Sequence, residues 1–224
     1  RGAAVKRLAL LALVAITVCG CAPRMRQVTP QELPASPLAA SLARTCRPDR
    51  AGMVLRHTVR LRIPGRKLDQ TLSGLMRFDG TGRTVRVVGM GGFGLKLFDL
   101  TVLPEGFETH FMHPGLGRMP GMAEHIAFCV RRIWLDPQPS GQDGFRQEGN
   151  SAFLCEKHGG ATVEHEFHGG ALTATRALGP EEYWEISYPD RTADGREPRN
   201  IIFTDGKGRY DLHIRLVETR EARQ

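Results

Sequence analysis

The sequence predicts a mainly β protein, one antiparallel sheet domain with two short helices. Apolar and polar residues alternate with a period of two in a series of short runs, as expected of strands with one buried face. Each gap between these runs holds glycine or proline, which favours tight turns between consecutive strands. The chain has 224 residues, 41% of them hydrophobic, and is long enough to bury the core of one such domain.

Residues 1–20 precede this domain and are predicted to be a lipoprotein signal peptide. Three basic residues stand before an eleven-residue apolar run, Leu8 to Val18, which is too short for a membrane-spanning helix. The run ends in Val18-Cys19-Gly20-Cys21, a pattern that resembles the bacterial lipobox. Cleavage before Cys21 would leave this cysteine to carry acyl chains, and two or three such chains hold a protein on a bilayer. An ordinary signal peptide that happens to contain cysteines is the alternative.

The residue after the lipidated cysteine bears on sorting. In enterobacterial lipoproteins an aspartate at this position marks retention in the inner membrane. Ala22 stands there in this chain, so we expect a lipid anchor in the outer membrane and a protein that faces the periplasm. Residues 21–35 are polar, contain three prolines and are predicted to be the lipidated tether. The domain then spans residues 36–219, and residues 220–224 form a C-terminal tail.

The elements of the domain follow from local signals. A short helix is predicted from Ser36 to Thr45, because Ser36 suits the N-cap and Pro37 the first helical position. A second helix is predicted from Pro120 to Leu135, where apolar residues recur at spacings of three and four. Eleven strands are predicted: Met53–Ile63, Leu68–Phe78, Arg83–Met90, Leu95–Leu103, Gly106–Phe111, Ser151–Glu156, Ala161–Phe167, Ala171–Leu178, Tyr183–Tyr188, Asn200–Thr204 and Tyr210–Val217.

Several short motifs in this pattern resemble the LolB-like outer-membrane lipoproteins of the LolA/LolB lipoprotein-localisation family. They are the segments Trp184–Tyr188, Pro198–Gly206 and Arg209–Leu212 and the glycine-rich turn Gly89–Gly94. The resemblance covers most of residues 53–217. It implies an unclosed antiparallel half-barrel of about eleven strands, with covering helices, around an apolar cavity that binds acyl chains. The polar segment 138–149 and the basic first strand differ from LolB itself and indicate a paralogue.

Two sets of candidate site residues follow. Trp184, Ile186 and Tyr188 lie on one face of their predicted strand and are expected to line the core or the cavity. Met90 and Phe93 flank a two-glycine turn, where large apolar residues are unusual. The resemblance implies that this turn contacts the membrane when cargo is delivered. The alternative is that Phe93 folds back onto the sheet.

The sequence predicts a protein that is not an enzyme and that needs no cofactor and no metal. The stretch Gly89–Gly94 echoes a nucleotide-binding loop, but a predicted strand rather than a helix follows it. Two histidine pairs have a spacing seen in metal sites, yet residues three apart on a strand point to opposite faces. The pairs are His110 with His113 and His165 with His168. These histidines are interpreted as exposed loop residues.

The charge balance argues against nucleic acid as a partner. The net charge is +7, and outside residues 1–20 only 28 basic residues stand against 24 acidic ones. The densest basic cluster is formed by Arg56, Arg60, Arg62, Arg66 and Lys67. It is interpreted as the solvated face of a strand, with attraction to anionic head groups or an acidic partner as the alternative. Glu164 and Glu166 share a strand face and are interpreted as exposed edge charges.

Three cysteines remain outside the signal peptide and the anchor, namely Cys46, Cys129 and Cys155. In an oxidising compartment they allow one disulfide with an odd thiol left over, and the sequence does not choose the pair. None lies in a C-x-x-C motif, so zinc or thioredoxin-like chemistry has no support.

Together these features predict an outer-membrane lipoprotein, expected to be monomeric, that binds acyl chains in a half-barrel cavity and accepts or places lipid or lipoprotein. Its expected partners are therefore acyl chains or lipoproteins and the outer membrane itself. The alternative is a non-catalytic periplasmic sensor or structural module of the same fold, with the cavity filled by its own side chains. A periplasmic hydrolase is a third, weaker hypothesis.

Overall fold

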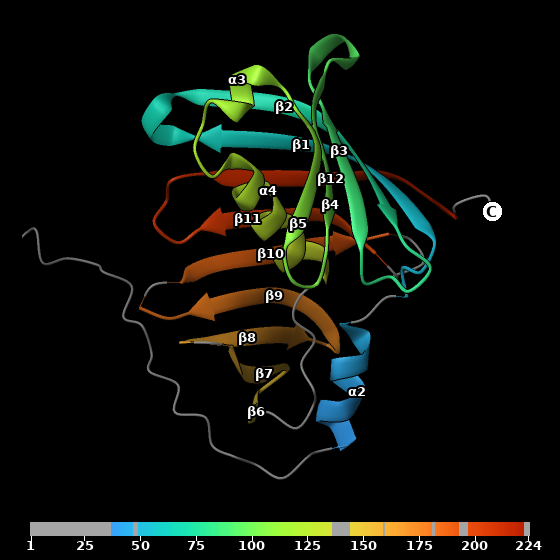
Figure 1. Cartoon of the computed structure of the whole chain (residues 1–224). Helices are drawn as coiled ribbons and strands as arrows, with labels where there is room; N and C mark the ends of the chain where they lie inside the picture. The colour runs from blue at the N-terminus through green and yellow to red at the C-terminus, as the bar shows by residue number, and fades with distance from the viewer. Residues whose placement is uncertain are drawn as a thin grey trace, which may run out of the picture. The chain divides into compact units, whose positions relative to one another are not determined.

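Twelve antiparallel strands form one continuous sheet in a computed structural model of the chain (Figure 1). The structure describes residues 37–46, 49–135, 144–158, 160–180, 182–192 and 197–221, all within one compact unit. The predicted signal peptide, the tether and Cys21 lie outside these residues. From one edge to the other, the strand order is β5-β4-β3-β2-β1-β12-β11-β10-β9-β8-β7-β6. Since β5 and β6 are the two edges, the sheet is unclosed, which confirms the predicted fold class.

Neighbouring strands pair along most of their length. The strands are β1 (Met53–Ile63), β2 (Leu68–Phe78), β3 (Val85–Met90), β4 (Lys96–Val102), β5 (Phe107–Met112), β6 (Gly144–Glu148), β7 (Ser151–His158), β8 (Ala161–His168), β9 (Ala171–Leu178), β10 (Tyr183–Arg191), β11 (Pro198–Asp205) and β12 (Asp211–Glu221). Register shifts interrupt several of these pairs, including β1 with β12 between Arg56 and His57. Such bulges bend strands, which suits a sheet that curves around a core.

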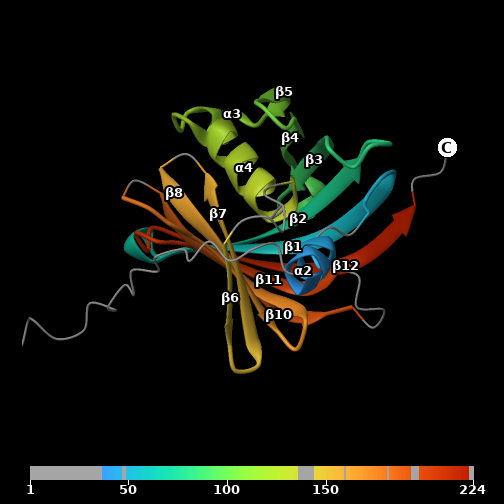
Figure 2. The same cartoon turned by 90° about the horizontal axis from the view of Figure 1, so that it is seen from below.

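Short helices lie on one face of this sheet. They are α2 (Pro37–Thr45), α3 (Pro114–Gly117) and α4 (Met122–Val130), and α4 continues into a π-helical segment, Arg131–Leu135. Figure 2 shows α4 between the β3–β5 side of the sheet and its β7–β8 side. We call the sheet face covered by α2 and α4 the inner face, and the opposite one the outer face.

Two apolar clusters fill the inner face. The central cluster lies under α4 and includes Leu55, Val87, Leu100, Trp184 and Phe203. The α2 cluster lies towards the β6 edge. Its members are Ala39, Leu42, Ala43, Leu154 and Phe167, with Phe145 packed against them. The core therefore comes from alternate residues of strands that are far apart in the sequence, as the period of two predicted.

Several elements differ from the sequence prediction. The short helix α3 was not predicted, and β10 and β12 run three and four residues past their predicted ends. Strand β6 was not predicted, and it lies in the polar, glycine-rich segment that follows the second helix. Only Phe145 of this short strand packs into the core, so no alternation marks it. The predicted helix from Pro120 begins two residues later, because Gly121 adopts a left-handed conformation (φ 72°) and stands at the N-cap of α4.

Charged side chains dominate the outer face. Arg146 on β6 contacts Glu164 on β8 at 3.1 Å, and Arg176 on β9 contacts Glu166 at 2.7 Å. The interpretation of these glutamates as exposed edge charges is wrong, because β8 lies inside the sheet and Glu164 is only 6% exposed. Neighbouring arginines pair with the two carboxylates, and this pairing offsets the free-energy cost of burying their charges.

Most of the predicted basic cluster lies on the same outer face. Arg56, Arg60, Arg62 and Lys67 are all exposed. Two of them have acidic neighbours on the adjacent strands: Arg60 donates to Asp69 at 2.7 Å, and Arg56 lies 3.7 Å from Glu218. The side chain of Arg66 is not among those that the structure describes. This arrangement is that of a solvated strand face whose charges are partly paired.

Candidate functional site

The inner-face residues predicted on β10 lie together. Trp184 and Ile186 are 2% and 0% exposed and belong to the central cluster, while Tyr188 is half-buried and packs against it. The Trp184 ring stacks on Phe203 with 6.2 Å between centroids, and its Nε1 donates to Glu182 at 2.8 Å. Burial raises the pKa of Tyr188 to about 12, so its hydroxyl is a neutral hydrogen-bonding group. This strand therefore offers the inner face a large apolar surface with one phenol.

A buried ion pair fixes the end of the α4 segment to the sheet. Arg50 donates to both carboxylate oxygens of Glu197, at 2.9 and 3.0 Å, and also to the main-chain oxygen of Trp134 at 3.1 Å. The guanidinium lies over the rings of Trp134 and Phe78, at 5.2 and 5.8 Å from their centroids. These contacts satisfy both charges inside an apolar region, where an unpaired charge would be costly.

His57 lies beside this pair on the inner face of β1. It is 3% exposed, and its ring is 5.1 Å from that of Trp134. Burial lowers the pKa of His57 to about 4, with the positive charge of Arg50 acting in the same direction. The imidazole is therefore neutral around pH 7, which fits an apolar surface. Sequence reasoning singled out none of Arg50, His57 and Glu197, because no local pattern surrounds them.

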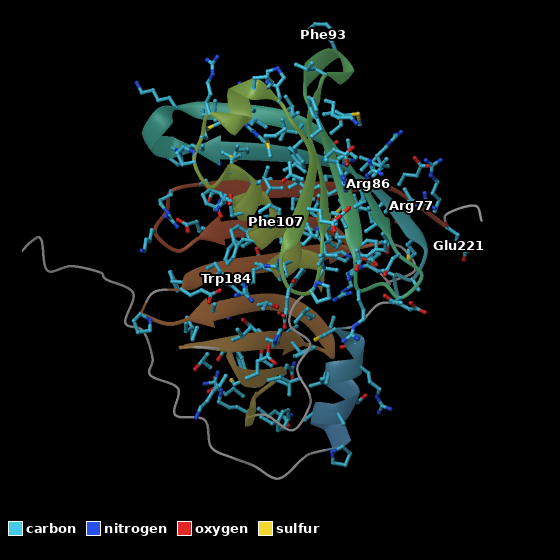
Figure 3. The ribbon with its side chains drawn as sticks, viewed as in Figure 1. Arg77, Arg86, Phe93, Phe107, Trp184 and Glu221 are labelled. Atoms are coloured by element: carbon cyan, nitrogen blue, oxygen red, sulfur yellow. The ribbon has the colours of Figure 1, made fainter. Side chains whose placement is uncertain are left out.

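The glycine-rich stretch forms the hairpin between β3 and β4 and is no nucleotide-binding loop. At Gly89, a Cβ atom would lie 2.2 Å from Cε1 of the Phe98 ring, so any other residue there would have to displace that ring. At the tip, Phe93 has φ 56° and ψ 22°, a conformation that costs a bulky residue about 1 kcal/mol or more. Its exposure is 112%, and Figure 3 shows it at the free end of the hairpin. Phe93 therefore does not fold back onto the sheet, and Met90 at the base is half-buried.

Other exposed apolar side chains follow the hairpin in the sequence. Of the seven large hydrophobic residues that are exposed among the described ones, Phe93, Leu95, Phe111 and Met119 belong to the stretch from the hairpin to the start of α4. Strand β5 continues the hairpin sheet, with Phe111 opposite Asp99 of β4. The ammonium of Lys96 lies 5.9 Å from the centroid of the Phe111 ring. Exposed apolar groups beside basic ones are typical of surfaces that meet a membrane interface.

The predicted histidine pairs do not come together as sites. His113 accepts from the main-chain N–H of Gly115 and caps α3, while His110 on β5 lies 2.7 Å from the Thr101 hydroxyl. His168 is exposed, but the interpretation as exposed loop residues is wrong for His165, which is 2% exposed within β8. Across the described part of the chain, no three histidine, cysteine or acidic side chains are grouped so as to hold a metal ion.

No disulfide joins any of the three cysteines that the structure describes. Cys46 is half-buried at the end of α2, whereas Cys129 on α4 and Cys155 on β7 are buried. Burial raises the pKa of both buried thiols to about 11, so neither is a reactive thiolate at neutral pH. Among the helices that the structure describes, none is long and apolar enough to cross a membrane.

Comparisons with known proteins find similar solved structures but no similar sequences of known family. No protein-family profile and no curated protein matches the chain. Among solved structures, a LolA superfamily protein from Nitrosomonas europaea matches with a TM-score of 0.55 at 8% identity, covering 86% of this chain and 94% of that one.

Two further solved structures match with lower scores. A DUF1329 family protein from Desulfovibrio piger has a TM-score of 0.46 at 8% identity, covering 84% of this chain and 94% of that one. A domain from Vibrio parahaemolyticus, described as an outer membrane lipoprotein-sorting protein, has 0.47 at 7%, covering 82% and 90%. At such low identity the likeness to the Nitrosomonas europaea protein, which has the highest TM-score of the three, shows the fold alone. The chain therefore has the same fold as that protein of the LolA superfamily.

Proposed function

We propose that this protein is a LolB-like outer-membrane lipoprotein, anchored through Cys21, that binds acyl chains on its inner face and accepts or places lipid or lipoprotein there. The observation that carries the proposal is the inner face itself. It is apolar across most strands of an unclosed sheet, and the short helix α4 covers it.

The composition of α4 supports this reading. Its buried residues, Ala127, Cys129 and Val130, face the central cluster. Ile126 and Phe128 are only half-buried, although they pack against the same cluster. A helix with apolar groups on more than one side suits a cover that has to contact an acyl chain as well as the core.

The β3–β4 hairpin supplies the second part of the proposal. Phe93, with Met90 at its base, is proposed to dip into the periplasm-facing surface of the outer membrane while cargo is transferred. A strained and wholly exposed phenylalanine has no role in packing the domain, so its energetic cost points to a function away from the core. One inserted side chain gains about 1.5–3 kcal/mol, which can orient a tethered domain but not anchor a free one.

The test of acyl binding uses the full chain with Cys21→Ala, so that no acyl chain is attached to the protein itself. We expect fatty acid or acylated material in its organic extract after purification from a membrane-containing host. Titration with a fluorescent acyl probe should show saturable binding, weakened several-fold in Ile126→Glu. Phe111→Glu introduces the same charge on the outer face of β5 and serves as the control. An empty extract with no saturable binding would contradict the proposal.

One observation favours a second candidate, a structural or sensor module. Trp134, Trp184 and Phe203 are all buried against the inner face, so the protein's own side chains already occupy much of it. A module of this kind would bind a protein partner and show no acyl binding in either assay. Unchanged thermal stability on addition of the acyl probe would support the module over the carrier.

A further inference from the structure

A row of polar side chains crosses the inner face between the two apolar clusters. On β8, His165 lies between Val163 of the central cluster and Phe167 of the α2 cluster. Its partner across the ladder is Thr175 on β9, which is 3% exposed. Alternate residues of a strand share a face, so these polar groups point into the same interior as their apolar neighbours.

Two more side chains extend this row on the neighbouring strands. Glu156 of β7 lies on the same face, and its Oε1 is 3.7 Å from Nε2 of His165. On the other side, the hydroxyl of Tyr188 on β10 forms a hydrogen bond with Thr175. The order across the sheet is thus carboxylate, imidazole, hydroxyl and phenol. We call these four residues the polar row.

The hydrogen bonding of the polar row is incomplete at one end. Nδ1 of His165 lies 3.2 Å from Oγ1 of Thr175 and is partnered. Nε2 of His165 and Oε1 of Glu156 are both buried and have no hydrogen-bond partner among the described residues. A separation of 3.7 Å is too long for a hydrogen bond between them. Buried polar atoms without partners are rare in folded proteins, so a pair of them calls for an explanation.

We propose that these two atoms bind the hydroxyl group of a neutral amphiphile whose acyl chain lies on the central cluster. A single hydroxyl oxygen can reach both atoms, because it donates its proton to Glu156 and accepts one from Nε2–H of His165. The central cluster continues from β8 to β12, about 19 Å at the usual strand spacing, which offers an apolar bed for the chain. The inference rests on acyl binding as proposed above and adds the chemistry of the head group.

The charge of the row selects among head groups. A fatty-acid carboxylate would meet the carboxylate of Glu156 in a region of low dielectric constant, where repulsion between like charges is strong. A glycerol hydroxyl brings no charge and can pair with both atoms. Arg146 and Arg176 lie on the outer face, where they pair with Glu164 and Glu166. Of the basic groups near the phenol of Tyr188, Arg50 pairs with Glu197 and Arg191 donates to the main-chain oxygen of Leu172. Monoacylglycerol is therefore the expected kind of ligand, and free fatty acid the disfavoured one.

The experiment compares 1-monooleoylglycerol with oleate, which share one acyl chain. Each ligand displaces a fluorescent acyl probe from the full chain carrying Cys21→Ala, at about pH 8 and below the concentrations at which the ligands aggregate. We expect about tenfold tighter binding of the neutral lipid, as one hydrogen bond to a charged group supplies. Glu156→Gln should raise the affinity for oleate and bring the ratio close to one. Glu166→Gln removes the same charge from the outer face of β8 and should leave the ratio unchanged.

Each result has a distinct meaning. Equal binding of the two ligands by the starting protein, or a ratio that Glu156→Gln leaves unchanged, overturns the head-group inference while acyl binding stands. If neither 1-monooleoylglycerol nor oleate binds, both the inference and the proposed function are overturned. Circular dichroism controls for folding, and His165→Asn provides a second variant. It removes the Nε2 donor and should weaken binding of the neutral lipid several-fold with little effect on oleate.

Discussion

Asp99 shows how a single buried carboxylate is kept ionised on the outer face. It is 2% exposed on β4, yet Arg86 donates to it at 2.9 and 3.0 Å and Lys96 at 3.1 Å. The hydrogen bonds from Arg86 are the main cause that lowers the pKa of Asp99 to about 2. The two cations are themselves half-exposed, so water screens part of their attraction.

This arrangement predicts a pH-dependent part of the stability. Because the folded-state pKa of Asp99 is depressed, its contribution is complete above the ordinary pKa near 4 and is lost as the pH falls towards 2. We expect Asp99→Asn to lower the free energy of unfolding by about 1–2 kcal/mol at about pH 6 and by almost nothing at about pH 2. Urea denaturation across this range measures the difference. Glu105→Gln, in the exposed β4–β5 turn, is the control, and a constant gap between wild type and Asp99→Asn would contradict the mechanism.

Among the substitutions considered in the core, the one at Trp184 is expected to lower the free energy of unfolding most. Its ring is 2% exposed, stacks on Phe203 and also lies 5.7 Å from the guanidinium of Arg132. Trp184→Ala would leave a large void that the surrounding strands cannot close, so we expect a loss of about 3–5 kcal/mol in the free energy of unfolding. Glu185→Ala, on the opposite face of the same strand, should cost less than about 1 kcal/mol. Equal costs in chemical denaturation would mean that the two faces are exchanged.

Single residues mark the limit of what the sequence could predict. Identity alone made Glu164 and His165 look like surface groups, since charged and polar side chains are mostly exposed. Their burial depends on partners from other strands, such as Arg146, which no local pattern reveals. Arg50 and Glu197 are 147 positions apart, and only the completed sheet brings them together.

At the scale of elements, the alternating pattern was a better guide. Strands β1 to β5 fall close to their predicted bounds because each has apolar residues on one face and glycine or proline between it and the next. Strand β6 was not predicted, because it contributes only one side chain to the core. An edge strand needs no more than that to pair with β7. Periodicity thus predicts strands with a full apolar face and misses those held mainly by their neighbour.

The β3–β4 hairpin is the element on which membrane contact can be tested. Phe93→Glu combined with Met90→Glu replaces two apolar side chains at the hairpin, and we expect the unlipidated protein to lose most of its association with anionic vesicles. Each lost insertion removes about 1.5–3 kcal/mol, a change that co-sedimentation detects. Folding and acyl binding should persist, because Phe93 makes no contribution to the core.

A matched variant separates membrane contact from a general effect of charge. Phe111→Glu places one new carboxylate on β5, beside Lys96, and should weaken sedimentation less than the double change does. Vesicle binding that is unchanged in the double variant would make this hairpin an ordinary turn with an exposed ring.

At the scale of the whole molecule, the proposed anchor and the sheet have separate tasks. In the proposed function the sheet would bind acyl chains on its inner face, while lipid on Cys21 would keep that face at the membrane. The hairpin alone gains too little free energy to hold the protein there. Two or three acyl chains supply a stable anchor, so the membrane location should depend on Cys21 rather than on any surface of the domain.

Fractionation of cells tests this division. Cys21→Ala should abolish acylation and release the protein into the soluble periplasmic fraction, because the remaining membrane contact is worth only about 1.5–3 kcal/mol. Cys19→Ala changes a cysteine two positions earlier, within the predicted signal peptide, and should leave the anchor intact. Ala22→Asp should move the lipidated protein towards the inner membrane in a host that follows the enterobacterial rule. If Cys21→Ala still fractionates with membranes as wild type does, another part of the protein holds it there, and the hairpin becomes the first place to look.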